Sequence, residues 1–366
     1  MNKPKLAFFI EDPYHIDFYL NIFKNLDKKK FILLLNNIDK KNNIFNKTIN
    51  ILEDLGINYL NLKNHKNHNF DYLISTMDSN ICFFNLFGKK IFFSKKNFFL
   101  IKIINFFKIN YSLIEKALSQ KIIFFPRGMD IKKKYLHKVK EEISDIFFCH
   151  SKIDQEILKN ETQKETFIIG YPRYNEILSK KNDSQKKNIL FLPSVSTLNR
   201  KDPNAQIESF FERFENYFQN YNFIFKPHPM FQPNEKIVLA VNNHSIKMLD
   251  QDSNLNFYYD IADYIICNNT GPFFSSIFKE KPTLILKEIK NDFHPLIEKI
   301  YNKYKNFYRV EEENICSLFK KNDFQKKFWL NQNNVKNNFK EELFKNSPEN
   351  GGQVCAEYLD KLINEA

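Results

Sequence analysis

The sequence is poor in glycine, with seven residues in 366, and its five cysteines are widely spaced without a Cys-x-x-Cys pair. Such cysteines argue against a disulfide framework or a structural zinc site and favour a reducing compartment. No apolar run reaches the roughly 18 residues that a membrane-spanning helix needs. The polar residues 1–5 and the short apolar run that follows are not those of a signal peptide. These absences predict a cytoplasmic protein.

Several signatures of catalysis and cofactor binding are also missing. The sequence contains neither the G-x-G-x-x-G turn of dinucleotide-binding folds nor the G-x-x-x-x-G-K-[ST] phosphate loop. It also lacks a G-x-S-x-G nucleophile turn, an H-E-x-x-H zinc motif and any cluster of cysteine and histidine. We therefore expect no metal site and no resident cofactor.

The composition that remains is that of a folded, basic protein. Hydrophobic residues make up 43% of the chain, which is ample for a core and excludes intrinsic disorder. Lysine and arginine exceed aspartate and glutamate by 55 − 43 = 12 charges. A basic balance predicts an anionic partner, which could be a phosphorylated small molecule, an acidic membrane or nucleic acid.

Short apolar runs recur along the whole chain and alternate with helical patterns. Each run has three to five residues, mostly isoleucine, leucine and phenylalanine, without polar alternation, which is typical of strands buried on both faces of a parallel sheet. This alternation predicts a doubly wound α/β fold. The expected strands are 6–10, 31–35, 72–74, 122–125, 146–149, 167–169, 189–192, 223–225, 264–267 and 283–286.

A charged stretch without core residues, 180–187, marks the expected domain boundary. We expect an N-terminal Rossmann-like domain over 1–180 on the acceptor side and a nucleotide-binding one over 181–347. A C-terminal helix within 348–366 is expected to pack back on the first domain. Two such sheets place a ligand between them, at the carboxyl ends of their strands.

Three of the seven glycines follow expected strands directly, namely Gly128, Gly170 and Gly271. In a chain with so little glycine, these positions predict a positive φ or a close approach of backbone to a ligand. Ordinary tight turns are the alternative.

The sharpest local motif is Lys226-Pro227-His228-Pro229, directly after a strand. The prolines stiffen the backbone, Lys226 offers a permanent charge for phosphate, and His228 can donate to phosphate or move a proton. A simple strand cap is the alternative. A second motif, 267–272, leads into a helix through Asn269, Thr270 and Gly271. Its free N–H groups and positive dipole end would suit an anion, with plain helix capping as the alternative.

Polar residues follow other strands as well. An arginine at a strand end suits bidentate contact with phosphate or carboxylate, and a histidine or aspartate there could move a proton. The remaining six histidines are assigned to the surface or to packing. The strand-end candidates are Arg127, Gly128 and Asp130 after one strand, Arg173 after another, His15 after the first, and Ser194 after the strand at 189–192.

Together these motifs resemble the CDP-glycerol glycerophosphotransferase family, the teichoic-acid-type transferases. The resemblance rests on residues 9–15, 169–175, 226–229 and 263–282 and covers most of the chain. It implies a GT-B-like fold, in which two Rossmann-like domains face a central cleft. It also implies transfer of a phosphorylated polyol from a CDP-activated donor to a cell-surface glycan or lipid-linked acceptor, with the donor as substrate and no cofactor. The histidine of the third motif, His228, would then bind phosphate or act in catalysis.

The sequence departs from this family at three places. Asn175 replaces an aspartate, and only Thr270 retains a hydroxyl where the family has a serine pair. Arg127 stands where the family carries the histidine expected to be the general base, and arginine is not a base at neutral pH. Either Asp130 or His15 takes that role, or the reaction differs.

Two other functions remain open. A His-Pro pair with a hydroxyl at a helix start also occurs in sialyl- and Kdo-transferases, which use CMP-sugars and an acidic base, a role open to Asp130. A basic nucleic-acid-binding protein is the alternative outside the enzymes. The lysines are spread over the whole chain and no RNA-binding signature is present, so we expect no nucleic-acid partner.

The segment 88–110 interleaves six lysines with phenylalanine and isoleucine and has no acidic residue. A helix from about residue 97 would gather Phe99, Ile103, Phe106 and Phe107 near one face. Such a helix could bind an anionic membrane surface, which predicts peripheral attachment to the inner face of the cell membrane. A core helix of the first domain is the alternative.

Overall fold

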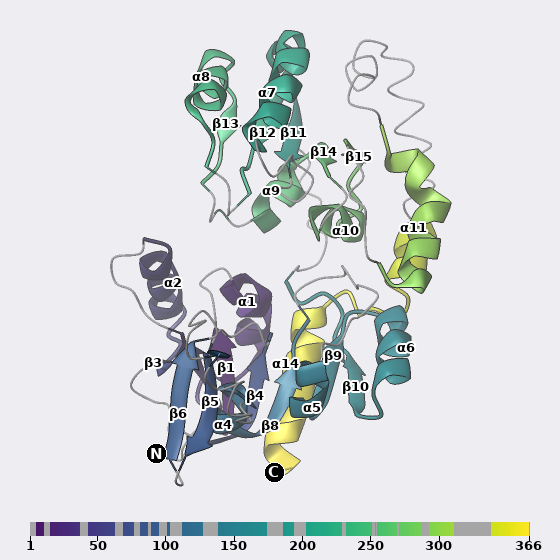
Figure 1. The fold of residues 1–366 in the computed structure, drawn as a ribbon. Coiled ribbons are helices and arrows are strands. Elements are labelled where there is room, and N and C mark those ends of the chain that lie inside the picture. The colour runs from purple at the N-terminus through teal and green to yellow at the C-terminus, as the bar shows by residue number, and fades with distance from the viewer. Residues whose placement is uncertain are drawn as a thin grey trace. The chain divides into compact units, whose positions relative to one another are not determined.

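The computed structural model divides the chain into two compact units (Figure 1). Unit 1 comprises Met1–Arg127, Tyr135–Asn175 and Asn346–Ala366, and unit 2 comprises Gly128–Lys134 and Glu176–Lys345. The residues described are 5–10, 15–36, 43–62, 69–76, 81–86, 89–94, 101–102, 112–126, 138–173, 186–193, 203–228, 232–250, 253, 255–268, 271–286, 293–310 and 338–365.

Unit 1 is built on a seven-stranded parallel sheet in the order β10-β9-β8-β4-β1-β2-β3. The apolar runs of β1 and β9 are buried at every residue, as expected for strands covered on both faces. The strands are β1 (Leu6–Ile10), β2 (Phe31–Leu35), β3 (Tyr59–Asn61), β4 (Phe70–Ser75), β8 (Ser119–Phe124), β9 (Ile146–Cys149) and β10 (Glu165–Ile168).

The two ends of the chain meet in this unit, because the C-terminal helix α14 (Gly351–Glu365) packs against α1 (Ile16–Asn25). Aromatic rings pack in this region, with the buried Phe8 against Phe23 at 4.9 Å and the partly buried Phe167 stacked on Tyr358 of α14 at 3.8 Å. The other described helices of unit 1 are α2 (Asn43–Asp54), α4 (Glu115–Leu118), α5 (Lys138–Ile143) and α6 (Lys152–Glu161).

A small antiparallel sheet, which the sequence did not predict, adjoins α4 in unit 1. It consists of β5 (Ile81–Leu86), β6 (Lys89–Ser94) and β7 (Ser112–Leu113), in the order β6-β5-β7. The expected amphipathic helix near 97–107 falls outside the described residues except for 101–102. Ile101 there is partly buried against a core cluster that includes Leu113.

Unit 2 is a second parallel sheet, of five strands in the order β13-β12-β11-β14-β15. Its core is rich in phenylalanine, and Phe191 stacks on Phe210 at 4.3 Å. The strands are β11 (Lys187–Leu192), β12 (Tyr221–Phe225), β13 (Lys247–Met248), β14 (Tyr264–Cys267) and β15 (Thr283–Ile285).

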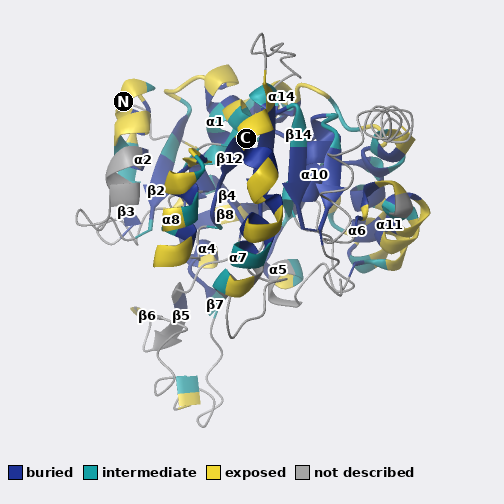
Figure 2. Cartoon of the chain, turned by 90° about the horizontal axis from the view of Figure 1, so that it is seen from above, coloured by how far each residue is buried: buried dark blue, intermediate teal, exposed yellow. Residues whose placement is uncertain are grey.

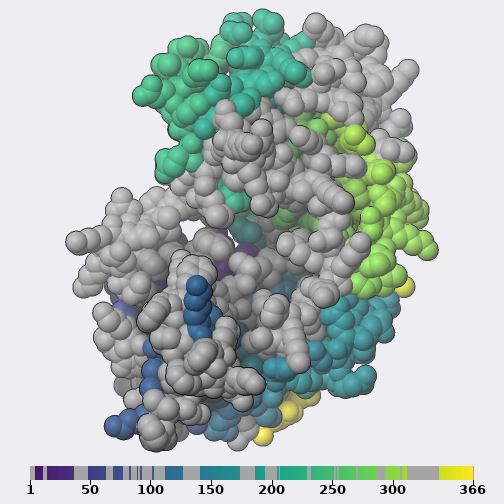
Figure 3. All heavy atoms as spheres, in the orientation of Figure 1, coloured from purple at the N-terminus to yellow at the C-terminus, as the bar shows by residue number. Residues whose placement is uncertain are grey.

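Most helices of unit 2 expose their outer faces, whereas the helix at 271–278 is buried along most of its length (Figure 2). Helix α11, light green in Figure 3, contributes the half-exposed side chains of Leu296 and Phe307 to the surface. The described helices are α7 (Pro203–Phe214), the 3₁₀ helix η3 (Glu215–Asn220), α8 (Glu235–Asn243), α9 (Leu255–Ile261), α10 (Gly271–Phe278) and α11 (Pro295–Tyr308).

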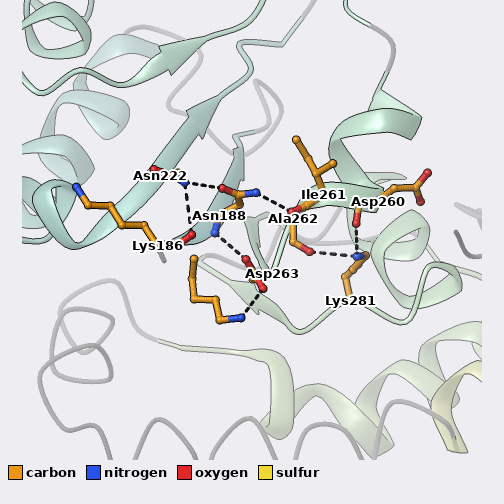
Figure 4. A network of polar contacts seen from close by, with 9 residues as sticks. Lys186, Asn188, Asn222, Asp260, Ile261, Ala262, Asp263 and Lys281 are labelled. Atoms are coloured by element: carbon orange, nitrogen blue, oxygen red, sulfur yellow. Dashed lines mark hydrogen bonds and ion pairs between the residues drawn. The ribbon is translucent and has the colours of Figure 1, made fainter. Parts of the chain in front are cut away.

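The amino ends of β11, β12 and β14 are joined by polar contacts (Figure 4). The Asn222 amide donates to the side-chain oxygen of Asn188 at 3.0 Å, and the Asn188 amide donates to the Ile261 carbonyl at 2.9 Å. The Asp263 carboxylate accepts from the backbone N–H of Asn188 at 2.8 Å and pairs with Lys187 at 3.0 Å. This edge of the sheet is therefore held by internal polar contacts.

The doubly wound α/β fold predicted from the sequence is confirmed. All ten expected strands are present, with bounds that differ by a few residues at most. In each parallel sheet the first strand lies in the interior, and later strands are added first towards one edge and then towards the other. This is the winding that the predicted fold requires.

Candidate functional site

The strand order reverses once in each sheet, and ligands of open α/β sheets bind at the carboxyl ends of the strands beside such a reversal. In unit 2 the reversal lies between β11 and β14, and in unit 1 it lies between β1 and β4. Most of the predicted site residues follow strands at these carboxyl edges.

Lys226 and Asn268 lie on either side of β11 at the carboxyl edge of unit 2. Lys226 follows β12 and donates its backbone N–H to the Phe191 carbonyl at 3.1 Å, while Asn268 follows β14. Because two strand spacings separate β12 from β14, their backbones are about 10 Å apart. Both side chains are buried, at 6% and 2% exposure. A lysine is rarely buried to this degree, which marks the position as special.

His228 lies two residues beyond Lys226 and is half-buried. Burial lowers the pKa of His228, and the nearby positive charge of Lys226 lowers it further. The imidazole is therefore neutral at pH 7, with one N–H donor and one acceptor nitrogen. A neutral histidine beside a buried ammonium group can donate to an anionic oxygen without adding a second buried positive charge.

Helix α10 begins at this edge, and buried hydroxyl groups hold its first turn. Ser275 donates to the Gly271 carbonyl at 3.1 Å, and Tyr259 on α9 donates to the Pro272 carbonyl at 3.2 Å. The first N–H groups of a helix have no intrahelical acceptor and suit an anion. Asn269 and Thr270, the predicted capping and phosphate-binding residues, fall outside the described residues.

The two described glycines among the predicted three behave differently. Gly170 has φ +71°, and an added Cβ would lie 2.4 Å from the Pro348 carbonyl oxygen, so its predicted need for glycine is confirmed. Gly271 has no positive φ, and an added Cβ would meet nothing within 4 Å. Of the two predicted reasons for glycine there, a positive φ is excluded, because the residue is the first of a regular helix, while a close approach of the backbone to a ligand stays a prediction.

Two predicted residues of unit 1, His15 and Arg173, meet around Phe18 of α1. The buried His15 ring lies 5.7 Å from the Phe18 ring, and the Arg173 guanidinium lies 5.1 Å from the same ring. Arg173 also pairs with Asp17 at 4.0 Å. The strand end at Gly170 thus reaches the start of α1, where the side chain of Asn21 donates to the Pro172 carbonyl at 2.8 Å.

His150, which the sequence analysis assigned to the surface or to packing, is the residue directly after β9 and is a packing residue. It is 2% exposed, and its Nδ1 lies 2.6 Å from the Gly170 carbonyl oxygen. Burial lowers the pKa of His150 to about 4, which outweighs the opposite effect of that hydrogen bond. Its place at a strand end was visible in the sequence, but its partner lies 20 residues further on.

The other predicted site residues, Arg127, Gly128, Asp130 and Ser194, fall outside the described residues. Within the part of the chain that the structure describes, no three His, Cys, Asp or Glu side chains gather in a way that could hold a metal ion. None of its helices has the length and apolar character to cross a membrane.

Solved structures with the same fold cover nearly the whole chain. The wall teichoic acid polymerase TagF matches with a TM-score of 0.58 and 12% identity, over 99% of this chain and 90% of that chain. A UDP-N-acetylglucosamine 2-epimerase matches with a TM-score of 0.55 and 13% identity, over 100% of this chain and 96% of that chain. S. aureus MnaA, solved with UDP, matches with a TM-score of 0.54 and 11% identity, over 99% of this chain and 96% of that chain.

No protein-family model matches the sequence, and neither does any curated protein. The structural matches confirm the predicted GT-B-like fold. The fold is thus one that a teichoic acid polymerase shares with UDP-N-acetylglucosamine 2-epimerases.

Proposed function

We propose that this protein transfers a phosphorylated polyol, of the glycerol phosphate kind, from a CDP-activated donor to a cell-surface glycan or lipid-linked acceptor. The observation that carries the proposal is the pairing of a buried lysine and a neutral histidine, Lys226 and His228, at the carboxyl end of β12, the strand next to the reversal of unit 2. The resemblance of residues 226–229 to the Lys-x-His-Pro motif of teichoic-acid-type transferases supports the same proposed reaction. A variant of TagF, the polymerase of that fold, was solved after soaking with CDPG.

The reaction needs stabilisation of negative charge on the departing cytidine monophosphate. A buried ammonium group acts strongly on such charge because little water screens it. His228 can donate a hydrogen bond to a phosphate oxygen or to the leaving oxygen, and the first N–H groups of α10 add positive dipole. These groups act without a metal, so we expect chelation by EDTA to leave turnover unchanged.

The test is nucleotide release from a panel of CDP-polyols, CMP-sugars and UDP-N-acetylglucosamine. We expect CMP from a CDP-polyol, with faster release when a polyol phosphate or glycan acceptor is added. CMP from a CMP-sugar alone would replace the proposal with a glycosyltransferase. Epimerisation of the UDP-sugar without release of CMP from any donor would replace it with the activity named for the epimerases of this fold.

A cytoplasmic enzyme acting on a lipid-linked acceptor would work at the inner membrane face. The basic, aromatic segment 88–110 supports such peripheral attachment, because lysine is attracted to anionic lipid and phenylalanine inserts below the headgroups. We include this attachment in the proposed function.

A further inference from the structure

Unit 2 has a pocket of about 850 Å³ at the amino edge of its sheet, here called the amino-edge pocket. The starts of β11 and β12, the 3₁₀ helix η3 and the end of α8 contribute to its walls. Lys226 and His228 follow the opposite end of β12, and a strand of five residues spans about 17 Å. The amino-edge pocket is therefore separate from the site proposed for the donor.

The charged side chains of this pocket are basic. Lys186 and Lys247 line it and are exposed, and none of the described residues that line it is acidic. The acidic groups nearby are engaged elsewhere. The Asp263 carboxylate holds the start of β11, and Glu215, 3.6 Å from His244, lines the neighbouring groove between α7 and α8. The pocket therefore attracts an anionic ligand.

Side-chain amides make up much of the remaining polar lining. Asn188 and Asn222 bond to one another and to backbone carbonyls, which fixes this part of the wall (Figure 4). Gln219 and Asn243 also line the pocket and are exposed. A side-chain amide both donates and accepts hydrogen bonds, as does the hydroxyl group of a sugar or polyol. This lining therefore suits a ligand rich in hydroxyl groups.

Ser245 lines the pocket in a backbone conformation that side chains rarely adopt. Its φ is +52°, directly after the C-cap of α8. The left-handed conformation costs a residue with a Cβ about 1–2 kcal/mol, and glycine is the usual residue at this place. The turn is held by the backbone N–H of Ile246, which donates to the Val241 carbonyl at 2.9 Å. Serine thus keeps an exposed hydroxyl at the pocket at a cost in stability that glycine would avoid.

We propose that the amino-edge pocket binds an acidic carbohydrate, namely a sugar or polyol chain that carries phosphate groups. Lys186 and Lys247 attract the phosphates, while the amides and Ser245 bond to the hydroxyl groups. Pockets for small molecules range from about 300 to 1,000 Å³, so this one has room for several sugar or polyol units. The inference does not depend on the proposed function, because it uses no residue of the carboxyl edge.

The test compares wild type with Lys186→Gln/Lys247→Gln by isothermal titration of a short glycerol phosphate oligomer. Both lysines are exposed, so the substitutions leave the core intact. We expect the affinity for the oligomer to fall about tenfold or more, with the affinity for CDP unchanged. The control Lys236→Gln/Lys299→Gln removes the same charge from α8 and α11, outside the pocket, and should bind the oligomer as wild type does.

Three results would overturn the proposal. The first is a wild type that does not bind the oligomer. The second is equal affinity of wild type and Lys186→Gln/Lys247→Gln, which would place the oligomer elsewhere. The third is an equal loss in the two double variants, which would show attraction by net charge alone. Failure of CMP release from every donor would remove the proposed function and leave this inference intact.

Two further probes separate charge from hydroxyl groups. Binding that is lost in Lys186→Gln/Lys247→Gln belongs to the pocket. By that criterion tripolyphosphate, which has charge without hydroxyl groups, should bind the pocket about tenfold more weakly than the oligomer, and maltotriose, which has no charge, should not bind measurably. Tripolyphosphate or a short RNA that binds the pocket as tightly as the oligomer would overturn the assignment to a carbohydrate.

Ser245→Gly separates recognition from folding. It removes the hydroxyl group and relieves the left-handed backbone, so the free energy of unfolding should not fall. The affinity for the oligomer should nevertheless fall about two- to tenfold, as expected for one lost hydrogen bond. Unchanged affinity in Ser245→Gly would contradict the role of this hydroxyl in the pocket.

Discussion

The two neutral histidines of the carboxyl edges owe their low pKa values to burial, but they differ in what surrounds them. His228 stands near the positive charge of Lys226, whereas His150 is bonded to a backbone carbonyl. The first arrangement suits donation to an anion, and the second fixes the position of the ring.

Replacing His228 should reduce catalysis much more than stability, because the half-buried ring is not part of either core. We expect His228→Ala to lower turnover of the preferred donor by about two to four orders of magnitude. Steady-state kinetics on the variant checks this, with His294→Ala, at the N-cap of α11, as the matched control. Near wild-type turnover in His228→Ala would remove the centre of the proposed function.

His150 should make stability depend on pH. Its folded pKa is about 4 and its ordinary value is 6.5, so the unfolded chain binds the proton first as the pH falls. The stabilisation is complete above pH 6.5 and is lost towards pH 4, by about 3 kcal/mol in all at about 1.4 kcal/mol per pKa unit. Urea unfolding at pH 7 and at pH 4.5 should therefore show that His150→Asn loses less free energy of unfolding than wild type as the pH falls. An equal loss in the two proteins would contradict this.

At the residue level, the sequence predicted those site residues whose signal lies in neighbouring positions of the chain. Lys226 and His228 stand between prolines at a strand end, and that signal lies within four residues. The contact of the His150 ring with the Gly170 carbonyl forms only because β9 and β10 are neighbours in the sheet. The meeting of His15 and Arg173 around Phe18 likewise depends on a long-range contact.

At the level of elements, the parallel strands were predictable because burial on both faces selects unbroken apolar runs. The antiparallel strands β5 and β6 were missed. The segment Lys89–Ser94 combines lysines with Ile91, Phe92 and Phe93, and this mixture of charge and apolar residues was interpreted as part of a basic amphipathic segment. Pairing with β5 decides its structure, and that pairing has no signature within the segment itself.

The two glycines Gly170 and Gly271, each of which follows a strand, should respond differently to alanine. Gly170→Ala forces a side chain into the left-handed region and against the Pro348 carbonyl, which should cost at least about 1–2 kcal/mol. Gly271→Ala enters open space in the first turn of α10 and should change stability by at most about 1 kcal/mol, in the stabilising direction. Denaturant titration of the pair measures this, and equal effects would show that the strand end at Gly170 adjusts freely.

At the level of the whole molecule, unit 1 takes in both ends of the chain through α14. Gly352 allows close approach to Asn21 of α1, where an added Cβ would lie 2.7 Å from the asparagine Cβ. The expected helix at 354–363 lies within α14, which begins earlier, at Gly351. The apolar pattern identified the helix, but its start depends on tight packing against α1 and residues 169–171 that no local pattern reveals.

The proposed membrane attachment concerns the whole molecule and can be tested directly. Flotation with anionic vesicles at low salt should carry wild type to the lipid fraction, and neutral vesicles should not, because lysine contributes through anionic lipid. The double variant Phe99→Ser/Phe106→Ser should float less, since it loses two inserting rings. A wild type that ignores anionic vesicles would assign the segment to the core of the first domain.

The central claim is that unit 2 binds a cytidine nucleotide through Lys226 at the carboxyl edge of its sheet. Isothermal titration of CDP into wild type and Lys226→Gln tests this most directly. We predict one CDP site per chain in wild type, weaker binding of UDP, and a loss of affinity of about tenfold or more in Lys226→Gln, as expected for a charge-assisted contact with phosphate. Absence of CDP binding to wild type, or equal affinity in the two proteins, would contradict the account.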